Sequence, residues 1–149
     1  LKPNNILETG VAYGWSSLAF LLGIKYNNHG NLISIDMPYP TLNNEDYVGY
    51  VVAEDLKKNW ELLRMPDIEG IPTAIKKIKT FDLCHYDSDK SYYGRKKSYP
   101  LLWNSLNKNG IFISDDITDN RAFEEFLVQI NRKPFIVKYK NQYLGLVKK

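Results

Sequence analysis

Two short apolar runs that end in acids constrain the fold of this chain more than any other feature. The first run, Phe81 to Tyr86, is followed by Asp87, and the second, Gly110 to Ser114, by Asp115 and Asp116. Short apolar runs are typical of parallel strands that are buried on both faces, and ligands collect beyond the carboxyl ends of such strands. The sequence therefore predicts an open α/β sheet in which two strand ends deliver carboxylates to one cleft.

Crowded carboxylates create an electrostatic problem at this cleft. Two of them about 4 Å apart repel by about 4 kcal/mol at an effective dielectric constant of about 20, so a convergent trio needs a proton or a cation. A divalent metal with oxygen ligands would satisfy Asp87, Asp115 and Asp116 together. We expect the whole segment from Asp87 to Lys90 to line the cleft.

The size and balance of the chain indicate one globular domain. Of its 149 residues, 44% are hydrophobic and 25% are charged, which allows a proper core. The net charge is only +3, and short basic runs such as residues 95–97 are interpreted as solvated faces, so we expect no nucleic acid partner. No apolar run approaches the roughly 20 residues that span a bilayer. A single Cys84 inside an apolar strand suits a reducing compartment such as the cytoplasm.

Strand and helix patterns alternate along the chain. We expect strands at residues 5–8, 31–36, 81–86 and 111–114 and a closing hairpin at 135–139 and 143–147. Expected helices start near Trp15 or Ser16 (apolar face Leu18, Phe20, Leu21, Leu22), at Glu54 (running on toward Arg64), at Ile71, at Tyr93 (broken or kinked by Pro100) and at a Thr118 cap. Residues 60–65 fit either the end of a helix or a third strand, and 37–53 an irregular loop. The pattern predicts a mostly parallel sheet with helices on both faces and an antiparallel last strand.

A loop with two glycines, Gly10 and Gly14, follows the first expected strand. Such a loop brings backbone close to a ligand, and the helix that begins near Ser16 points N–H groups at an anionic group. A dinucleotide fingerprint would need glycines where Ala12 and Trp15 stand. The loop therefore suits a nucleoside with a small zwitterionic tail better than a dinucleotide.

Acids at two strand ends flank this loop. Glu8 is expected to face an ammonium or sulfonium group of the ligand. Asp36 ends the second strand, and its two oxygens can accept hydrogen bonds from both hydroxyls of a ribose. Together with the later acidic strand ends, these acids indicate a nucleoside site.

At these residues the chain resembles the class I S-adenosylmethionine-dependent methyltransferases, from Asn5 to the C terminus. The segment 8–17, E-T-G-V-A-Y-G-W-S-S, resembles the first motif of that family, and S-I-D at 34–36 resembles its ribose-binding strand end. More specifically, D-S-D-K-S-Y-Y-G at 87–94 with N-G-I-F-I-S-D-D at 109–116 resembles the cation-dependent O-methyltransferases of the catechol and caffeoyl-CoA kind, and a related branch that acts on macrolide sugars.

The resemblance implies a Rossmann-like fold, S-adenosyl-L-methionine as cofactor, and magnesium bound by Asp87, Asp115 and Asp116, with Asp87 also bordering the cofactor. It also implies a small-molecule hydroxyl as acceptor and Lys90 as general base. Asp67 is the candidate for the acid that meets the adenine amino group. Asp116 departs from the commoner Asn at its position, which keeps a metal oxygen and adds a charge.

Other interpretations stay open. The fold could serve as a non-catalytic binding module, and a nucleotide-dependent oxidoreductase is disfavoured by Ala12 and Trp15. Lys90 could be a solvated lysine, and the sign of its pKa shift is open, because a metal would lower its pKa and carboxylates would raise it. Helices that precede the first strand in relatives are absent from residues 1–149, so we expect a domain without that cover. A homo-oligomer is allowed.

Overall fold

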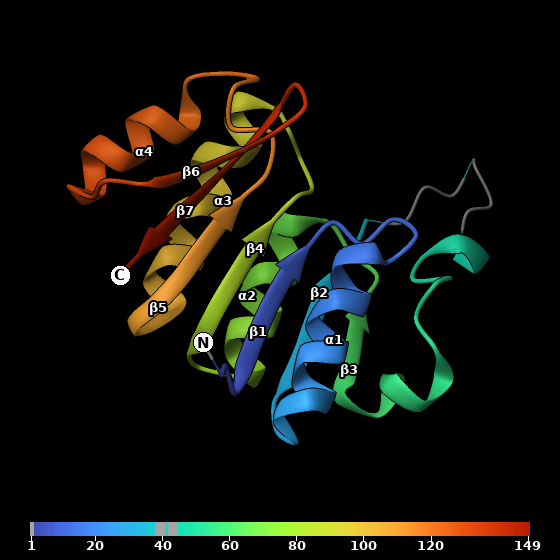
Figure 1. The fold of residues 1–149 in the computed structure, drawn as a ribbon. Coiled ribbons are helices and arrows are strands. Elements are labelled where there is room, and N and C mark those ends of the chain that lie inside the picture. The colour runs from blue at the N-terminus through green and yellow to red at the C-terminus, as the bar shows by residue number, and fades with distance from the viewer. Residues whose placement is uncertain (1, 38–40, 42–44) are drawn as a thin grey trace.

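The structure is a computed structural model that describes residues 2–37, 41 and 45–149, and its core is a twisted sheet flanked by helices (Figure 1). The elements in chain order are β1 (Asn5–Thr9), α1 (Trp15–Asn27), β2 (Asn31–Ile35), η1 (Glu45–Tyr47), η2 (Glu54–Asn59), β3 (Trp60–Leu63), α2 (Asp67–Lys77), β4 (Phe81–Tyr86), α3 (Tyr92–Ser105), β5 (Leu106–Ser114), α4 (Ala122–Ile130), β6 (Phe135–Tyr139) and β7 (Gln142–Lys148). Residues 38–40 and 42–44 of the predicted loop lie outside the described residues.

The sheet confirms the predicted fold class. Its strand order is β3-β2-β1-β4-β5-β7-β6, with parallel pairing from β3 to β5. Strand β7 runs antiparallel to β5, and β6 antiparallel to β7, as the closing hairpin predicted. Because the strand order reverses between β1 and β4, the carboxyl ends of these two strands form the switch point at which open α/β sheets bind ligands.

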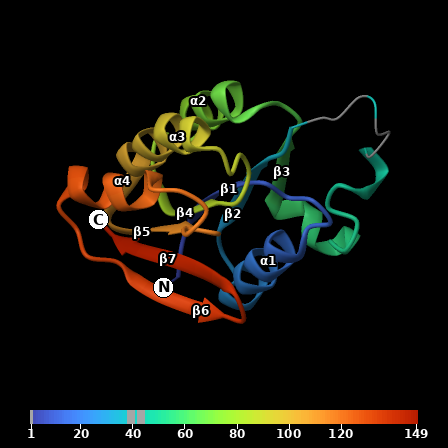
Figure 2. The same ribbon diagram turned by 90° about the horizontal axis from the view of Figure 1, so that it is seen from above.

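Helices cover both faces of the sheet, which explains why the central strands are continuous apolar runs (Figure 2). Helices α2, α3 and α4 pack on one face over the larger core, to which Leu7 and Phe112 contribute. Helix α1 and the 3-10 helix η2 cover β1 to β3 on the other face, where Ile6 and Leu83 belong to a smaller core. Among the described residues, no helix covers β6 on the face of the sheet where α1 lies, and all five residues of β6 are exposed.

The segment between β2 and α2 differs from the expected helices. The helix expected from Glu54 to about Asn59 is the 3-10 helix η2, and it does not run on toward Arg64. Of the two alternatives for residues 60–65, the structure has the third strand, because Trp60–Leu63 forms β3. Four residues are too few to show a periodic pattern, so the sequence does not distinguish a strand from a helix here. Tertiary contacts favour the strand, because β3 pairs with β2 and the Trp60 indole donates to Ser34 Oγ at 2.8 Å. Helix α2 begins at Asp67, earlier than Ile71, which brings that acid to the sheet end.

One expected helix break and two element boundaries differ from the structure. Helix α3 continues through Pro100, which does not break it, and β5 begins at Leu106 rather than Ile111. Helix α4 begins at Ala122, and its first free N–H is bound by the Asn120 side chain at 3.1 Å, not by Thr118. Short polar side chains at adjacent loop positions compete for this cap, which sequence alone does not resolve.

Helix α1 begins at Trp15 as expected, but Gly14, in a left-handed conformation, precedes it without a side-chain cap. Leu22 of its predicted apolar face is 50% exposed, whereas Leu21 is buried. Within the described parts of the chain, no helix has the length and apolar character needed to cross a bilayer.

Candidate active site

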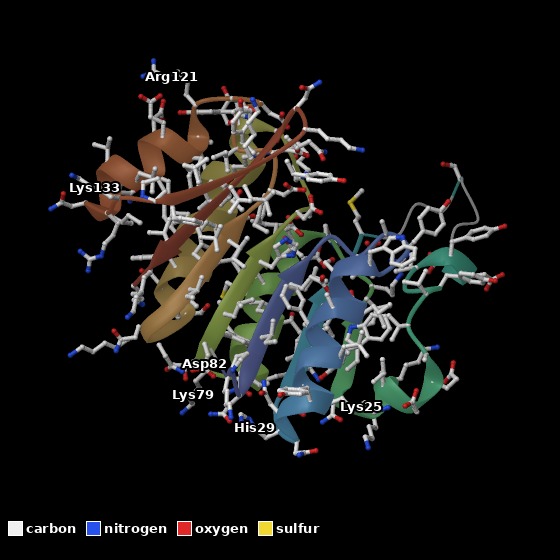
Figure 3. The ribbon with its side chains drawn as sticks, viewed as in Figure 1. Lys25, His29, Lys79, Asp82, Arg121 and Lys133 are labelled. Carbon is white, nitrogen blue, oxygen red and sulfur yellow. The ribbon has the colours of Figure 1, made fainter. Side chains whose placement is uncertain are left out.

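The carboxyl ends of the central strands surround a cavity of about 760 Å³, a size that suits a nucleoside ligand. It brings together five of the predicted site residues: Gly10, Asp36, Asp67, Asp87 and Lys90. The side chains of His29, Lys79 and Asp82 lie at the opposite edge of the sheet (Figure 3). The cavity therefore brings together the ends of β1, β2 and β4 as expected, whereas Asp115 and Asp116, which follow β5, are not among its described lining residues.

Gly10 allows the loop after β1 to pass directly over the end of β4. Its φ is +79°, and a Cβ at this position would lie 2.2 Å from the Asp87 carbonyl oxygen. The two strand ends are also joined by the Asp87 N–H, which donates to the Thr9 carbonyl at 2.9 Å. Any larger residue would push the loop away from the cavity floor, which is the structural reason for this glycine.

Asp36 fixes the same loop through its carboxylate. Oδ2 accepts hydrogen bonds from the backbone N–H groups of Val11 at 2.8 Å and Ala12 at 3.0 Å. Oδ1 accepts from the Arg64 guanidinium, which also pairs with Glu45 of η1. Because Oδ2 already has two donors, a ribose would find its free acceptor position on Oδ1, not on both oxygens as expected. The pairing of Arg64 with Asp36 was not predicted, because no local sequence pattern connects two residues that are 28 positions apart.

Asp67 lies at the first turn of α2 and lines the cavity. The Ser88 hydroxyl donates to its Oδ2 and lies 2.9 Å from Thr9 Oγ1, so three elements meet here. Burial raises the pKa of Asp67, and the nearby charge of Asp89 adds to this rise against the Ser88 hydrogen bond. Asp67 is therefore an acid in the cavity wall, and its contact with an adenine amino group stays a prediction.

The three predicted metal ligands form one cluster. Asp87, Asp115 and Asp116 each offer a carboxylate oxygen, and these oxygens lie within 4.8 Å of one another. Three carboxylates at this spacing are the hard oxygen donors that Mg²⁺ prefers, so the donor set fits a divalent cation. Sequence reasoning therefore identified the acidic cluster correctly.

Lys90 lies inside this cluster. Its ammonium donates to Asp87 Oδ1, and it is 2.9 Å from Asp116 Oδ2 and 3.9 Å from Asp115 Oδ2. Burial works against a charged lysine, but the hydrogen bonds to Asp87 and Asp116 outweigh it and raise the pKa of Lys90. For Asp87, by contrast, burial raises the pKa, an effect that Lys90 opposes and Asp115 reinforces. Without a metal, the cluster therefore favours the charged form of Lys90.

A family described as "Methyltransferase domain" matches residues 7–117, which include the glycine loop and the whole acidic cluster. The chain belongs to this family. The match confirms the methyltransferase that the motifs predicted. Among curated proteins, none matches this methyltransferase domain by sequence.

Solved structures agree in fold. The O-methyltransferase from Bacillus cereus in complex with SAH is 15% identical with a TM-score of 0.73, and the match covers 99% of this chain and 74% of that chain. TDP-rhamnose 3'-O-methyltransferase, an enzyme in calicheamicin biosynthesis, is 15% identical with a TM-score of 0.73, and the match covers 97% of this chain and 71% of that chain. The O-methyltransferase NovP is 15% identical with a TM-score of 0.69, and the match covers 98% of this chain and 72% of that chain. These likenesses show that the domain has the Rossmann-like methyltransferase fold.

Three residues of the first motif do not line the cavity as expected. Glu8 is fully buried on the α1 face of the sheet, where its Oε2 accepts from the hydroxyls of Ser17 and Ser34. Burial alone would raise the pKa of Glu8, but His85 and the surrounding serine hydroxyls lower it. Ser16 and Gly14 are also absent from the described lining. Glu8 therefore links α1 to β2 inside the core and does not line the cavity, where it was expected to face a ligand ammonium or sulfonium.

The alternation of side chains along a strand could have revealed the orientation of Glu8. Residues two apart point to the same face, so Glu8 must face the same way as Ile6, which packs under α1. Leu7 and Thr9 then point to the other face, and the Thr9 hydroxyl contacts Ser88 at the cavity. Glu8, the one acid of the first motif, thus serves the fold, and the acids that line the cavity come from other segments.

Proposed function

We propose that this domain transfers the methyl group of S-adenosyl-L-methionine to a hydroxyl oxygen of a small molecule, assisted by Mg²⁺ bound to Asp87, Asp115 and Asp116. The observation that carries the proposal is that Asp87 belongs both to the acidic cluster and to the lining of the cavity that also holds Gly10 and Asp36. A methyl donor and a metal-bound acceptor would meet at this junction, where positioning supplies much of the rate.

The nucleoside end of the cofactor fits the other part of the cavity. Asp36 Oδ1 would accept from a ribose hydroxyl, and Asp67 would accept from the adenine amino group. Gly10, Val11 and Ala12 line the cavity, so the backbone of this loop would contact the methionine part of the cofactor. The SAH bound in the Bacillus cereus enzyme supports this choice of cofactor.

The acidic cluster would act on the acceptor. A bound Mg²⁺ would lower the pKa of an acceptor hydroxyl, which makes its oxygen a better nucleophile. Lys90 is the side chain that is placed to take the acceptor's proton. Its present hydrogen bonds favour the charged form, which cannot accept a proton, so this role requires Asp87 and Asp116 to bind another cation.

A second candidate function follows from the same observation. Because the Lys90 ammonium already pairs with Asp87 and Asp116, the domain could bind the nucleoside without a metal and without turnover. The two functions differ in metal binding and in methyl transfer. They share cofactor binding.

Turnover with radiolabelled S-adenosyl-L-methionine tests the proposal. Catechols and deoxysugar nucleotides would serve as acceptors, with Mg²⁺ or with EDTA. We expect transfer that EDTA abolishes and that Asp115→Ala lowers at least a hundredfold. The matched control, Glu124→Gln, removes an exposed acid of a surface pair and should leave the rate unchanged. Transfer that persists in EDTA would remove the three acids from the metal role, and cofactor binding without transfer to any acceptor would favour the second candidate.

A further inference from the structure

Arg95 is fully buried, although its neighbours in the basic run, Lys96 and Lys97, are exposed. The expectation that residues 95–97 form one solvated face is therefore wrong for the arginine. Arg95 lies in the first turn of α3 and reaches under the loop that follows β5. It does not line the cavity, so the proposed chemistry has not used it so far.

The Arg95 guanidinium contacts the backbone of the acidic cluster. Its Nη1 donates to the Asp116 carbonyl oxygen at 2.9 Å, and its Nη2 lies 3.4 Å from Asp119 Oδ2. Its Nε has no hydrogen-bond partner among the described residues. One good hydrogen bond to a carbonyl and one long contact to a half-exposed acid are few for a buried guanidinium, which carries five N–H donors.

Such an arrangement is not explained by stability. A buried charge with incomplete partners costs more free energy than an apolar side chain of similar volume, so a methionine or leucine would serve the core better. What an apolar residue could not do is hold the Asp116 carbonyl. The buried guanidinium thus indicates a task at that carbonyl.

The carbonyl belongs to a turn that must stay in an unusual conformation. Asp116 has a φ of +48°, in the left-handed region that non-glycine residues disfavour. Within the turn, the Asp115 N–H donates to the Tyr86 carbonyl at 3.0 Å, and the Asp116 N–H donates to Asp115 Oδ1 at 2.9 Å. On the carbonyl side, the Arg95 guanidinium donates at 2.9 Å and the Asp119 N–H at 3.2 Å, so both sides of the turn are fixed.

We propose that Arg95 is a positioning residue: by holding the Asp116 carbonyl, it keeps the Asp115–Asp116 turn in the conformation that brings both carboxylates to Asp87 in one cation site. The inference rests on the proposed metal site. It extends that site to a residue whose own side chain touches neither the cavity nor the carboxylates of Asp87 and Asp115.

Titration with Mn²⁺ alone, followed by electron paramagnetic resonance, tests this role. Arg95→Met removes the donors at similar volume and should weaken Mn²⁺ binding at least tenfold. Arg95→Lys, which keeps one charged donor, should recover part of the affinity. The matched control is Lys96→Met, which removes an exposed cation from the next position of the same helix and should bind Mn²⁺ like the unaltered protein.

Hydrogen exchange without metal gives a second readout. Amides 115–121 should exchange faster in Arg95→Met than in Lys96→Met, while affinity for S-adenosylhomocysteine changes less than twofold in both. Equal Mn²⁺ affinity in Arg95→Met and the unaltered protein would overturn the inference and leave the proposed function standing. A parallel loss of S-adenosylhomocysteine and Mn²⁺ binding in both Arg95 variants would assign Arg95 to general folding and overturn it as well. An unaltered protein that binds S-adenosylhomocysteine but no Mn²⁺ would refute both this inference and the metal part of the proposed function.

Discussion

Replacing Asp36 by alanine should weaken cofactor binding and loosen the glycine loop together. The carboxylate accepts from the N–H groups of Val11 and Ala12 and from the Arg64 guanidinium, and its side chain is only 11% exposed. A hydrogen bond to a charged group contributes about 1.5–3 kcal/mol, but water can replace part of this at the exposed Ala12 amide. We therefore expect a loss of about 2 kcal/mol in unfolding free energy, which corresponds to about 4–8 °C in Tm for a domain of this size.

The same variant loses the acceptor for a ribose hydroxyl. A loss of about 1.4 kcal/mol is tenfold in affinity, and a displaced loop adds to it, so S-adenosylhomocysteine should bind at least tenfold more weakly in calorimetry. Arg64→Met separates the two effects, because it removes the ion pair but keeps Asp36 as an acceptor for the loop. Equal affinity of Asp36→Ala and the unaltered protein would refute the ribose assignment.

Two other predictions concern backbone and core. Gly10→Ala should lower the unfolding free energy by at least about 2 kcal/mol in urea titration, because a Cβ meets the Asp87 carbonyl at a φ that disfavours alanine. Burial raises the pKa of the Cys84 thiol to about 12. The native thiol should therefore not react with Ellman's reagent at pH 8, whereas the unfolded chain should react. Since the folded pKa is above the unfolded one, Cys84 lowers stability only as pH rises from about 8.5 toward 12, and Cys84→Ala should reduce this alkaline loss.

Local patterns predicted the sheet and the acidic cluster because both depend on neighbouring residues. A strand buried on both faces is apolar throughout, and the first polar residues after it lie at the sheet edge, as Asp87 and Asp115 do. Parallel pairing of β4 and β5 then brings these ends together, with Tyr86 opposite Ser114. The closeness of the acids that follow β4 and β5 could therefore be predicted from the sequence.

Interactions between distant segments were beyond local patterns. The pairing of Arg64 with Asp36, and the capture of Lys90 by Asp87 and Asp116, depend on how loops cross in space. Strand β3 was ambiguous for the same reason. In contrast, the burial of Arg95 had a local signal, because Tyr99 and Leu102 follow at helical spacing and share its buried face.

Calorimetry of the unaltered protein with S-adenosylhomocysteine tests the central claim, that the cavity beside Gly10, Asp36 and Asp67 binds an adenosyl cofactor. We expect saturable binding with one ligand per chain and no binding of NAD at the same concentrations. Absence of S-adenosylhomocysteine binding, or binding of NAD in its place, would contradict the account.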